Sequence, residues 1–368
     1  MGGVMEERDA RLLLSMWSES GDMAIGARVR DMGAVAVVGE ICEGRSRLAQ
    51  AEAIALRRGD GDASTLLETT WAAAERANAR YVIPGDGEWP TQLDDLRARM
   101  PLGLWVAGAG NLRLLALRSI AIVGARAATS YGESVARELG AHLAEEEWLT
   151  VSGGAFGIDA AAHRGAMAAE GVTACVLAGG VDVPYPRSHT SMLSRIRESG
   201  VLVSETPLGG AAMRHRFLSR NRLIAALSRA TVVVEAAVRS GSRTTAREAS
   251  ELARVVMAFP GPVTSPLSSG CHALIRDGMA AIVTSPRDVL DLVSGRTPQV
   301  SLEPAALGWR EQRVLDAVPL RRPSSLTNLA RVAGLGTAEA MASIGLLDAL
   351  GLVERRGDGW IRRQESMA

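Results

Sequence analysis

The spacing of apolar positions along the chain changes near residue 119. Before residue 78, apolar side chains recur at intervals of three or four, a period that predicts short amphipathic helices. They include Leu12, Leu13, Trp17, Leu48, Ile54, Leu56, Leu66, Leu67 and Trp71. We therefore interpret residues 1–80 as a small helical domain.

From residue 119 onwards, short continuous apolar runs alternate with helical stretches. The runs occupy residues 119–123, 148–151, 172–177, 201–203, 231–234 and 255–259. Runs without a polar alternation are typical of strands that are buried on both faces of a sheet. The pattern predicts an α/β fold in which an extended Rossmann-like parallel sheet carries helices on either side.

The remaining segments complete a predicted organisation in domains. Residues 81–111 hold Pro and Gly around short apolar pieces, so we expect an irregular connector that joins the sheet domain, which would span residues 81–295. Residues 296–308 are typical of a linker. In residues 309–368, three short helical patterns precede a hairpin-like segment with its turn at residues 357–359, an order that predicts a winged helix.

The composition restricts the chemistry. The 41 basic and 41 acidic residues cancel, so an anion site must be local rather than the product of an overall positive field. All the basic residues are Arg, which excludes a Lys Schiff base and a Walker lysine. Cys42, Cys175 and Cys271 form no CxxC pair, and no apolar run reaches the ~18 residues that span a bilayer. We expect a cytoplasmic protein with no membrane contact, metal or other cofactor.

Two strands of the expected sheet end in turns that lead into helices. Arg126 stands in the first turn, and Ser152, Gly153, Gly154 and Phe156 stand in the second. Such turns direct backbone N–H groups and a positive helix end towards an anion. Neither turn contains GxGxxG, which disfavours a dinucleotide. A tight turn needs Gly in any case, so the pair, rather than either turn alone, indicates a crevice for several phosphates.

A basic segment follows later in the chain. It contains Arg214, Phe217, Arg220, Asn221 and Arg222 and then becomes apolar. A basic groove with an aromatic face is typical of a platform for single-stranded nucleic acid, in which Arg pairs with phosphates and a ring stacks on a base. The alternative is a solvated helix start with Phe217 in the core.

A third candidate anion site opens the next helix. Arg239, Ser240, Gly241 and Ser242 follow the expected strand at 231–234. Their hydroxyl and glycine content suits a phosphate nest. The plainer alternative is a helix N-cap, and Ser242 fits both roles.

Candidates for catalysis are few. Asp159 and His163 are four residues apart on one expected helix, so a base and its orienting partner could share a face. An Asp at a helix start and a His one turn later are as typical of a cap and a packing contact. The rival hypothesis is a nucleotide-binding hydrolase of a related Rossmann family that uses Asp159, His163 or Glu235. A third reading makes the tail a duplex-DNA-binding winged helix and the sheet domain a dimer scaffold.

Taken together, these motifs resemble the DprA/Smf family of DNA-processing proteins. The resembling residues, in the family's order, are 122–126, Tyr131, Gly132, 152–159, Ala162, His163, Gly165, 177–182, Tyr185, Pro186, Ser204, Glu205, Phe217, 220–222, 234–236, 239–242, Thr245, Ala246, Pro260 and Gly261. They cover most of the middle domain. The Pro-Gly-Gly-x-Gly-Thr run of the related hydrolases is missing.

The resemblance implies a function and a set of site residues. It implies a homodimeric, non-enzymatic binder of single-stranded DNA that helps to load the RecA recombinase during natural transformation. It also implies that the N-terminal helices are SAM-like. The positions that match the family's strand-binding pocket are Arg126, Gly153, Gly154, Phe217, Arg220 and Asn221.

The chain departs from the family pattern at Leu218, and its sequence also suggests a dimer contact. Leu218 stands where the family usually has Pro, which could alter the loop without removing Arg220 or Asn221. For the dimer contact, we expect the apolar residues Ala273, Leu274 and Ile275.

Overall fold

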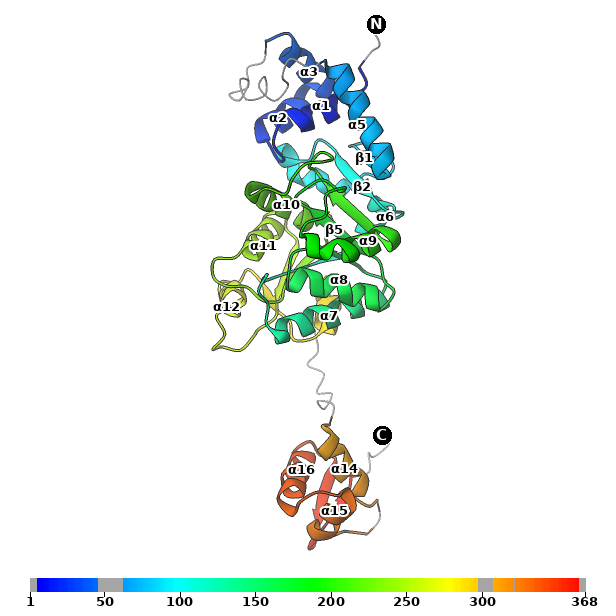
Figure 1. Cartoon of the computed structure of the whole chain (residues 1–368). Helices are drawn as coiled ribbons and strands as arrows, with labels where there is room; N and C mark the ends of the chain where they lie inside the picture. The colour runs from blue at the N-terminus through cyan, green and yellow to red at the C-terminus, as the bar shows by residue number, and fades with distance from the viewer. Residues whose placement is uncertain (1–4, 46–61, 297–306, 321, 364–368) are drawn as a thin grey trace. The chain divides into compact units, whose positions relative to one another are not determined.

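The computed structural model describes residues 5–45, 62–296, 307–320 and 322–363. Contacts divide the chain into two compact units, Met1–Pro298 and Gln299–Ala368 (Figure 1). Leu48, Ile54 and Leu56, and most of the expected linker, lie outside the described residues. No helix within the described ranges is long and apolar enough to cross a membrane.

The larger unit is built on one sheet, which has nine strands within the described residues, in the order β1-β2-β6-β5-β4-β3-β7-β8-β9. The strands are β1 (Ala79–Val82), β2 (Leu104–Ala107), β3 (Ser119–Val123), β4 (Leu149–Ser152), β5 (Thr173–Leu177), β6 (Val201–Ser204), β7 (Ala230–Val233), β8 (Val255–Ala258) and β9 (Ala281–Ile282). From β6 to β9 all neighbours are parallel. The predicted α/β fold with a parallel-dominated sheet is confirmed.

The sheet departs from the prediction at one end. Each strand expected from the sequence lies within one residue of its predicted bounds. However, the segment expected to be an irregular connector contributes β1 and β2, which pair antiparallel with each other and, through β2, with β6. The same segment forms the short helix η1 (Thr91–Arg99), and the short helix α6 (Leu112–Ala116) follows it. The connector prediction was therefore wrong in detail, and the sheet is mixed rather than purely parallel.

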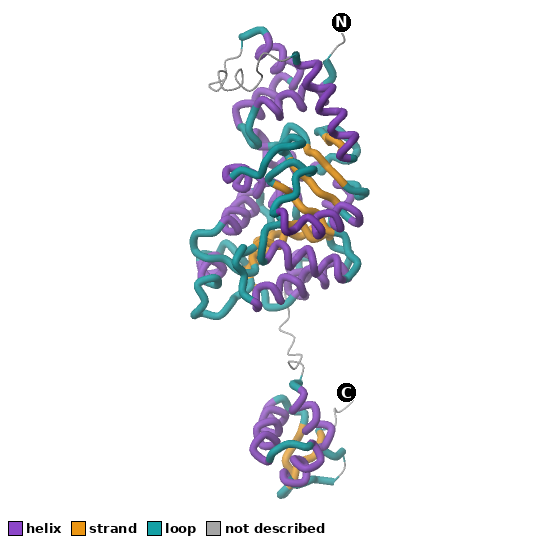
Figure 2. The backbone as a smooth tube through the Cα atoms, viewed as in Figure 1, coloured by secondary structure: helices purple, strands orange, loops and turns teal. Residues whose placement is uncertain are grey.

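Helices cover both faces of the sheet (Figure 2). They are α7 (Ser130–Glu145), α8 (Ile158–Ala168), α9 (Thr190–Ser199), α10 (Arg214–Leu227), α11 (Gly241–Glu251), α12 (Ser269–Arg276) and α13 (Pro286–Val293), with the short η2 (Arg187–His189) before α9. Ala121 packs with α10, α11 and α12, whereas its neighbour Ile122 packs with α7, α8 and α13. Successive side chains of a strand point to opposite faces, so a strand covered on both sides must be apolar throughout.

Chain order places a switch point in the middle of this sheet. From β3 the chain adds β4, β5 and β6 on one side, and then crosses to add β7 and β8 on the other. In open α/β sheets, ligands bind in the crevice at the carboxyl ends of the strands where the order reverses. That crevice lies between β3 and β7.

The N-terminal helices form their own small core. They are α1 (Glu7–Trp17), α2 (Met23–Met32), α3 (Ala34–Cys42) and α5 (Ala63–Ala77). Leu13, Trp17, Ile25 and Val38 are buried together between them. Leu12 instead packs with side chains of the sheet region, which joins these helices to the same compact unit. The boundary at residue 80 and the SAM-like assignment stay predictions.

The smaller unit has the expected order of three helices and a hairpin in its described residues. Its elements are α14 (Trp309–Ala317), α15 (Leu326–Ala333), α16 (Thr337–Ala349), β10 (Val353–Arg356) and the antiparallel β11 (Gly359–Arg362). Val314, Leu329, Ile344 and Val353 lie in its core. The winged-helix assignment stays a prediction.

The expected dimer contact was wrong at its central residue. Leu274 lies on α12 and is only 1% exposed, within the core that packs on the sheet, and Ala273 is buried beside it. Ile275 is half-buried against the same core. A side chain that fills the subunit's own core cannot contact a second copy.

Candidate nucleic-acid interface

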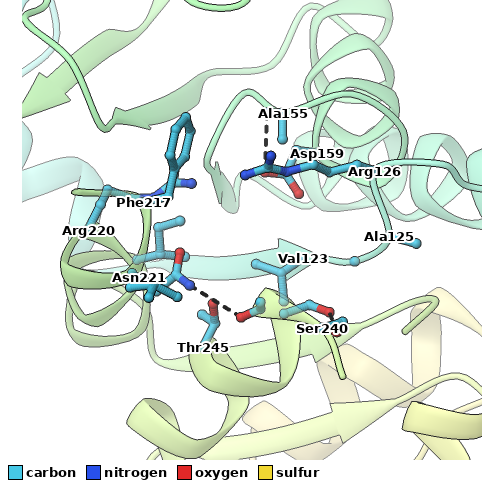
Figure 3. A pocket seen from close by; sticks show the side chains of 15 residues that line it. Val123, Ala125, Arg126, Ala155, Asp159, Phe217, Arg220, Asn221, Ser240 and Thr245 are labelled. Atoms are coloured by element: carbon cyan, nitrogen blue, oxygen red, sulfur yellow. Dashed lines mark hydrogen bonds between the residues drawn. The ribbon is translucent and has the colours of Figure 1, made fainter. Parts of the chain in front are cut away.

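A cavity of about 290 Å³ opens in the crevice between β3 and β7. Its wall combines the end of β3 and the residues after it, the start of α8, the middle of α10 and the start of α11 (Figure 3). The predicted site residues that line it are Arg126, Phe217, Arg220, Asn221, Ser240, Gly241 and Ser242. Segments far apart in the sequence thus meet at one position. The predicted residues of the second turn are absent from the wall, namely Ser152, Gly153, Gly154 and Phe156.

Buried polar contacts hold the turn that carries Arg126. The Glu235 carboxylate, 1% exposed, accepts hydrogen bonds from the Thr129 backbone N–H at 2.9 Å and from the Thr129 hydroxyl at 2.6 Å. A Cβ at Gly132 would collide with Glu235, so only Gly permits this approach. Glu235 therefore fixes the start of α7 and the turn before it.

The ring of Phe217 forms part of the cavity wall. Phe217 is half-buried on α10 and belongs to none of the buried core clusters of the described residues. The Cζ atom of Arg126 lies 4.9 Å from the centre of its ring, and the ring of Tyr185 lies 5.5 Å away at 57°. These contacts place Phe217 among cations and another aromatic ring instead of in the core.

Arg220 is a buried cation on the wall of the same cavity. It is 6% exposed, and its Nη1 donates to the Val176 carbonyl. Its buried Nε finds no hydrogen-bond acceptor within the described residues. Burial lowers the pKa of Arg220, and the nearby Asp159 carboxylate opposes this effect. A Cβ at Gly153 would collide with the guanidinium, so Gly153 makes room for Arg220.

Asp159 closes the turn between β4 and α8. Its carboxylate accepts from the backbone N–H groups of Gly153 at 3.1 Å and of Ala155 at 3.4 Å. Burial raises the pKa of Asp159, whereas Arg220 and these N–H groups lower it. Asp159 thus fixes the conformation of this turn, and it also lines the cavity.

The possible base and orienting partner do not meet. The Nδ1 atom of His163 lies 2.7 Å from the Thr173 hydroxyl, and burial lowers the His163 pKa to about 3. Asp159 is engaged by its own turn, and Glu235 is occupied by Thr129. Each residue of the rival hydrolase hypothesis therefore has a structural partner. Among the described residues, no group of His, Cys, Asp and Glu could hold a metal ion.

Arg222 lies away from the cavity. It is 2% exposed, and its Nη2 donates to both carboxylate oxygens of Glu205 at 2.8 Å. Its Nε donates to the Arg99 carbonyl at 2.9 Å. A buried, fully neutralised guanidinium cannot reach a phosphate without breaking this pair. The structure therefore gives Arg222 a packing role in place of the expected DNA contact.

Two residues of the second turn also act on the fold. The Ser152 hydroxyl, fully buried, donates to the Ile122 carbonyl at 2.6 Å. Gly154 has φ of +67°, and a Cβ there would collide with the Cys175 sulfur. Neither residue is part of the cavity wall. They shape the turn that presents Asp159.

Three further predicted residues lie on the surface outside the cavity wall. Arg214 and Arg239 are exposed at the starts of α10 and α11. Phe156 is 49% exposed, with its ring 4.6 Å from that of His189. These side chains are accessible to a ligand that extends beyond the cavity.

A family model described as DNA recombination-mediator protein A matches residues 80–294. The chain belongs to this family. The DNA processing protein DprA of Mycobacterium tuberculosis is 41% identical over 363 residues, which are 94% of this chain and 92% of that protein. The DprA/Smf resemblance is thereby confirmed.

Two solved structures of the DprA family share the fold. The X-ray structure of DNA processing protein A from Streptococcus pneumoniae superposes with a TM-score of 0.67 and 30% identity, over 78% of this chain and 98% of that one. DNA processing protein A from Helicobacter pylori gives a TM-score of 0.52 and 26% identity, over 59% of this chain and 96% of its own. The Helicobacter protein is described as having a single-stranded DNA binding mode.

Sequence reasoning about this DprA-family chain missed some residues of the site. Ile224 also lines the cavity wall, but an apolar side chain carries no signal of its own, and Ala155 and Thr245 stood out only as parts of the family motifs. Tyr185 was seen only as part of a family motif. A Tyr between two Pro residues, shortly after an apolar strand, was the signal that could have drawn attention to it.

Proposed function

We propose that this chain binds single-stranded DNA without sequence preference, with one nucleotide held at the cavity. The observation that carries the proposal is the contact between Arg126 and Phe217 in the crevice between β3 and β7. A single strand offers phosphates for Arg and an unpaired base face for an aromatic ring, and stacking works with every base.

The geometry suggests how the two groups share this strand. Stacked aromatic layers are about 3.5 Å apart, so a base can reach this face of Phe217 only if Arg126 leaves the ring. Arg126 is exposed and can turn to a phosphate. The Arg220 guanidinium adds a second positive charge to the same wall. Asn221, Ser240 and Ser242 add polar groups to the same wall.

Family membership supports a proposal for the wider role. We propose that the chain acts as a homodimer and delivers single-stranded DNA to the RecA recombinase during natural transformation, with no catalytic step of its own. The match to a recombination-mediator family supports this role. Light scattering tests the dimer. Loading is tested by measuring how fast RecA hydrolyses ATP on single strands coated with a single-strand-binding protein. This rate of hydrolysis should rise when the chain is added.

Polarisation titrations test the binding proposal. Labelled oligo-dT and a duplex of the same length are titrated at several salt concentrations. We expect a preference for the single strand and an affinity that falls with salt, with a slope of about 0.7 for each phosphate contact. Equal affinity for the duplex, or no salt dependence, would overturn the proposal. If a chain ending at Arg296 stays folded and loses all binding, the site belongs to the smaller unit instead.

A further inference from the structure

Aromatic side chains continue along the carboxyl edge of the sheet beyond the cavity. The chain contains only three Phe and three Tyr. Tyr185 is 46% exposed and Phe156 is 49% exposed. They follow β5 and β4, which extend the sheet in parallel from β3, so both lie at the edge where the cavity opens. Exposed rings beside a cavity lined by Arg are suited to bases.

Tyr185 offers more open aromatic surface than Phe217. Its ring touches that of Phe217 at 5.5 Å between centres, with the planes tilted by 57°. Arg126 meanwhile occupies part of the Phe217 ring. Tyr185 therefore extends the aromatic wall outward from the residue at which the first base would stack.

The segment of residues 185–189 is anchored to the turn after β4. His189, 4% exposed, lies with its Nδ1 3.0 Å from the Gly154 carbonyl oxygen, and its ring contacts Phe156. Between Tyr185 and His189, Arg187 is exposed. The Tyr185 ring and the Arg187 cation thus lie on one short segment, which His189 fixes at its C-terminal end.

We propose that residues 185–189 form a second nucleotide subsite, in which Tyr185 stacks on the base next to the one at Phe217 and Arg187 pairs with a phosphate. The inference rests on the proposed binding of single-stranded DNA at the cavity. It adds a direction to that binding, because the strand would run from the crevice across β4 towards β5. The simpler role for Tyr185 is to support the Phe217 ring from the side, without touching DNA.

Oligonucleotide length separates these two roles. Tyr185→Leu keeps the apolar volume and removes the π face, and Tyr185→Phe keeps the ring. With oligo-dT of about 16 nucleotides, Tyr185→Leu should weaken binding by about 5- to 150-fold, whereas Tyr185→Phe should bind like the unaltered chain. If Tyr185 only supports Phe217, even a ligand confined to the cavity, such as thymidine 3′,5′-bisphosphate, loses affinity in proportion. An equal loss for this mononucleotide and for the long strand, or no loss for either, would overturn the inference.

Photocrosslinking gives a readout that a supporting role would not produce. An oligo-dT that carries 5-iododeoxyuridine at one position is irradiated with the full chain, and the attached peptide is mapped by mass spectrometry. We expect attachment at Tyr185 as well as at Phe217, because a strand bound without sequence preference brings the label to either ring. The Tyr185 product should persist in Tyr185→Phe and disappear in Tyr185→Leu. Attachment at Phe217 alone would assign Tyr185 the supporting role.

The same titrations distinguish the failure of the inference from the failure of the proposed function. If the unaltered chain does not bind oligo-dT, both fail. If it binds, and Phe217→Leu weakens binding while Tyr185→Leu leaves it unchanged for every length, the cavity binds DNA and only the second subsite is rejected. Arg187→Ala provides an independent check, since losing a phosphate contact should lower the salt slope for the long strand by about 0.7.

Discussion

The guanidinium carbon of Arg126 lies 4.9 Å from the centre of the Phe217 ring, and the two side chains come from opposite sides of the crevice. Arg126 follows β3, whereas Phe217 lies on α10, which precedes β7. The residues after β3 and the first turns of α10 line the same cavity, so the Arg126 cation meets the Phe217 ring. Each group has a natural ligand in a single strand, the phosphate for one and the base for the other.

The first prediction separates Phe217 from the core phenylalanine Phe259. Phe217→Ala should weaken oligo-dT binding by about 1–3 kcal/mol with a small change in melting temperature, because its ring lies on the cavity wall. Phe259→Ala should cost about 3–5 kcal/mol of stability and leave the affinity of the folded protein unchanged, because Phe259 is 3% exposed in the core. Polarisation and thermal melting of both variants check this. The reverse pattern would place Phe217 in the core.

The second prediction contrasts Arg126 and Arg222, both of which the sequence analysis assigns to the DNA site. Arg126→Ala should lower the salt slope of binding by about 0.7 and leave the melting temperature unchanged, since Arg126 is exposed. Arg222→Ala should lower the free energy of unfolding by about 3–5 kcal/mol, because it leaves Glu205 buried without its cation. Urea denaturation and salt titrations of each variant measure the two effects. A stable Arg222→Ala variant with a reduced salt slope would restore Arg222 to the DNA site.

The fold was predictable where burial imposed a simple pattern. β3 is buried at every position, and its continuous apolar run could only be a strand covered on both faces. β1 carries Arg80, whose guanidinium is held by Glu88, so its run is interrupted. β2 is flanked by Gly103 and Gly108, so its apolar run falls within a Gly- and Pro-rich stretch. Local patterns cannot show that such short pieces are completed by pairing with β6.

The site was predictable in its location but not in the role of every residue. The turn after β3 and the basic segment each carry a local signal, and both contribute to the cavity. Arg220 and Arg222 are two positions apart, yet one lines the cavity and the other pairs with Glu205 from the end of β6. The two side chains point in different directions from α10, and Arg222 meets a partner seventeen positions earlier in the chain. Neither is contained in the local composition.

The third prediction concerns Leu274. Leu274→Arg should unfold the protein or cost about 4 kcal/mol or more, because it places an unpaired charge in the core under α12. Thermal melting and light scattering are measured together. A variant with an unaltered melting temperature that became monomeric would return this residue to the dimer contact. As a control, Leu274→Met keeps the volume and should cost less than about 1.5 kcal/mol.

The last prediction follows from the buried His163. Burial lowers its pKa to about 3 in the folded chain, against about 6.5 in an unfolded one, so between these pH values the unfolded state binds one more proton. The contribution of His163 to stability is therefore complete above about pH 6.5 and declines as the pH falls towards 3, by about 1.4 kcal/mol per pH unit. His163→Gln removes this titration and should flatten the pH dependence of unfolding, whatever it costs in packing. Urea denaturation from pH 7 to pH 5 compares the two chains, and equal slopes would show that His163 binds its proton equally in the folded and unfolded states.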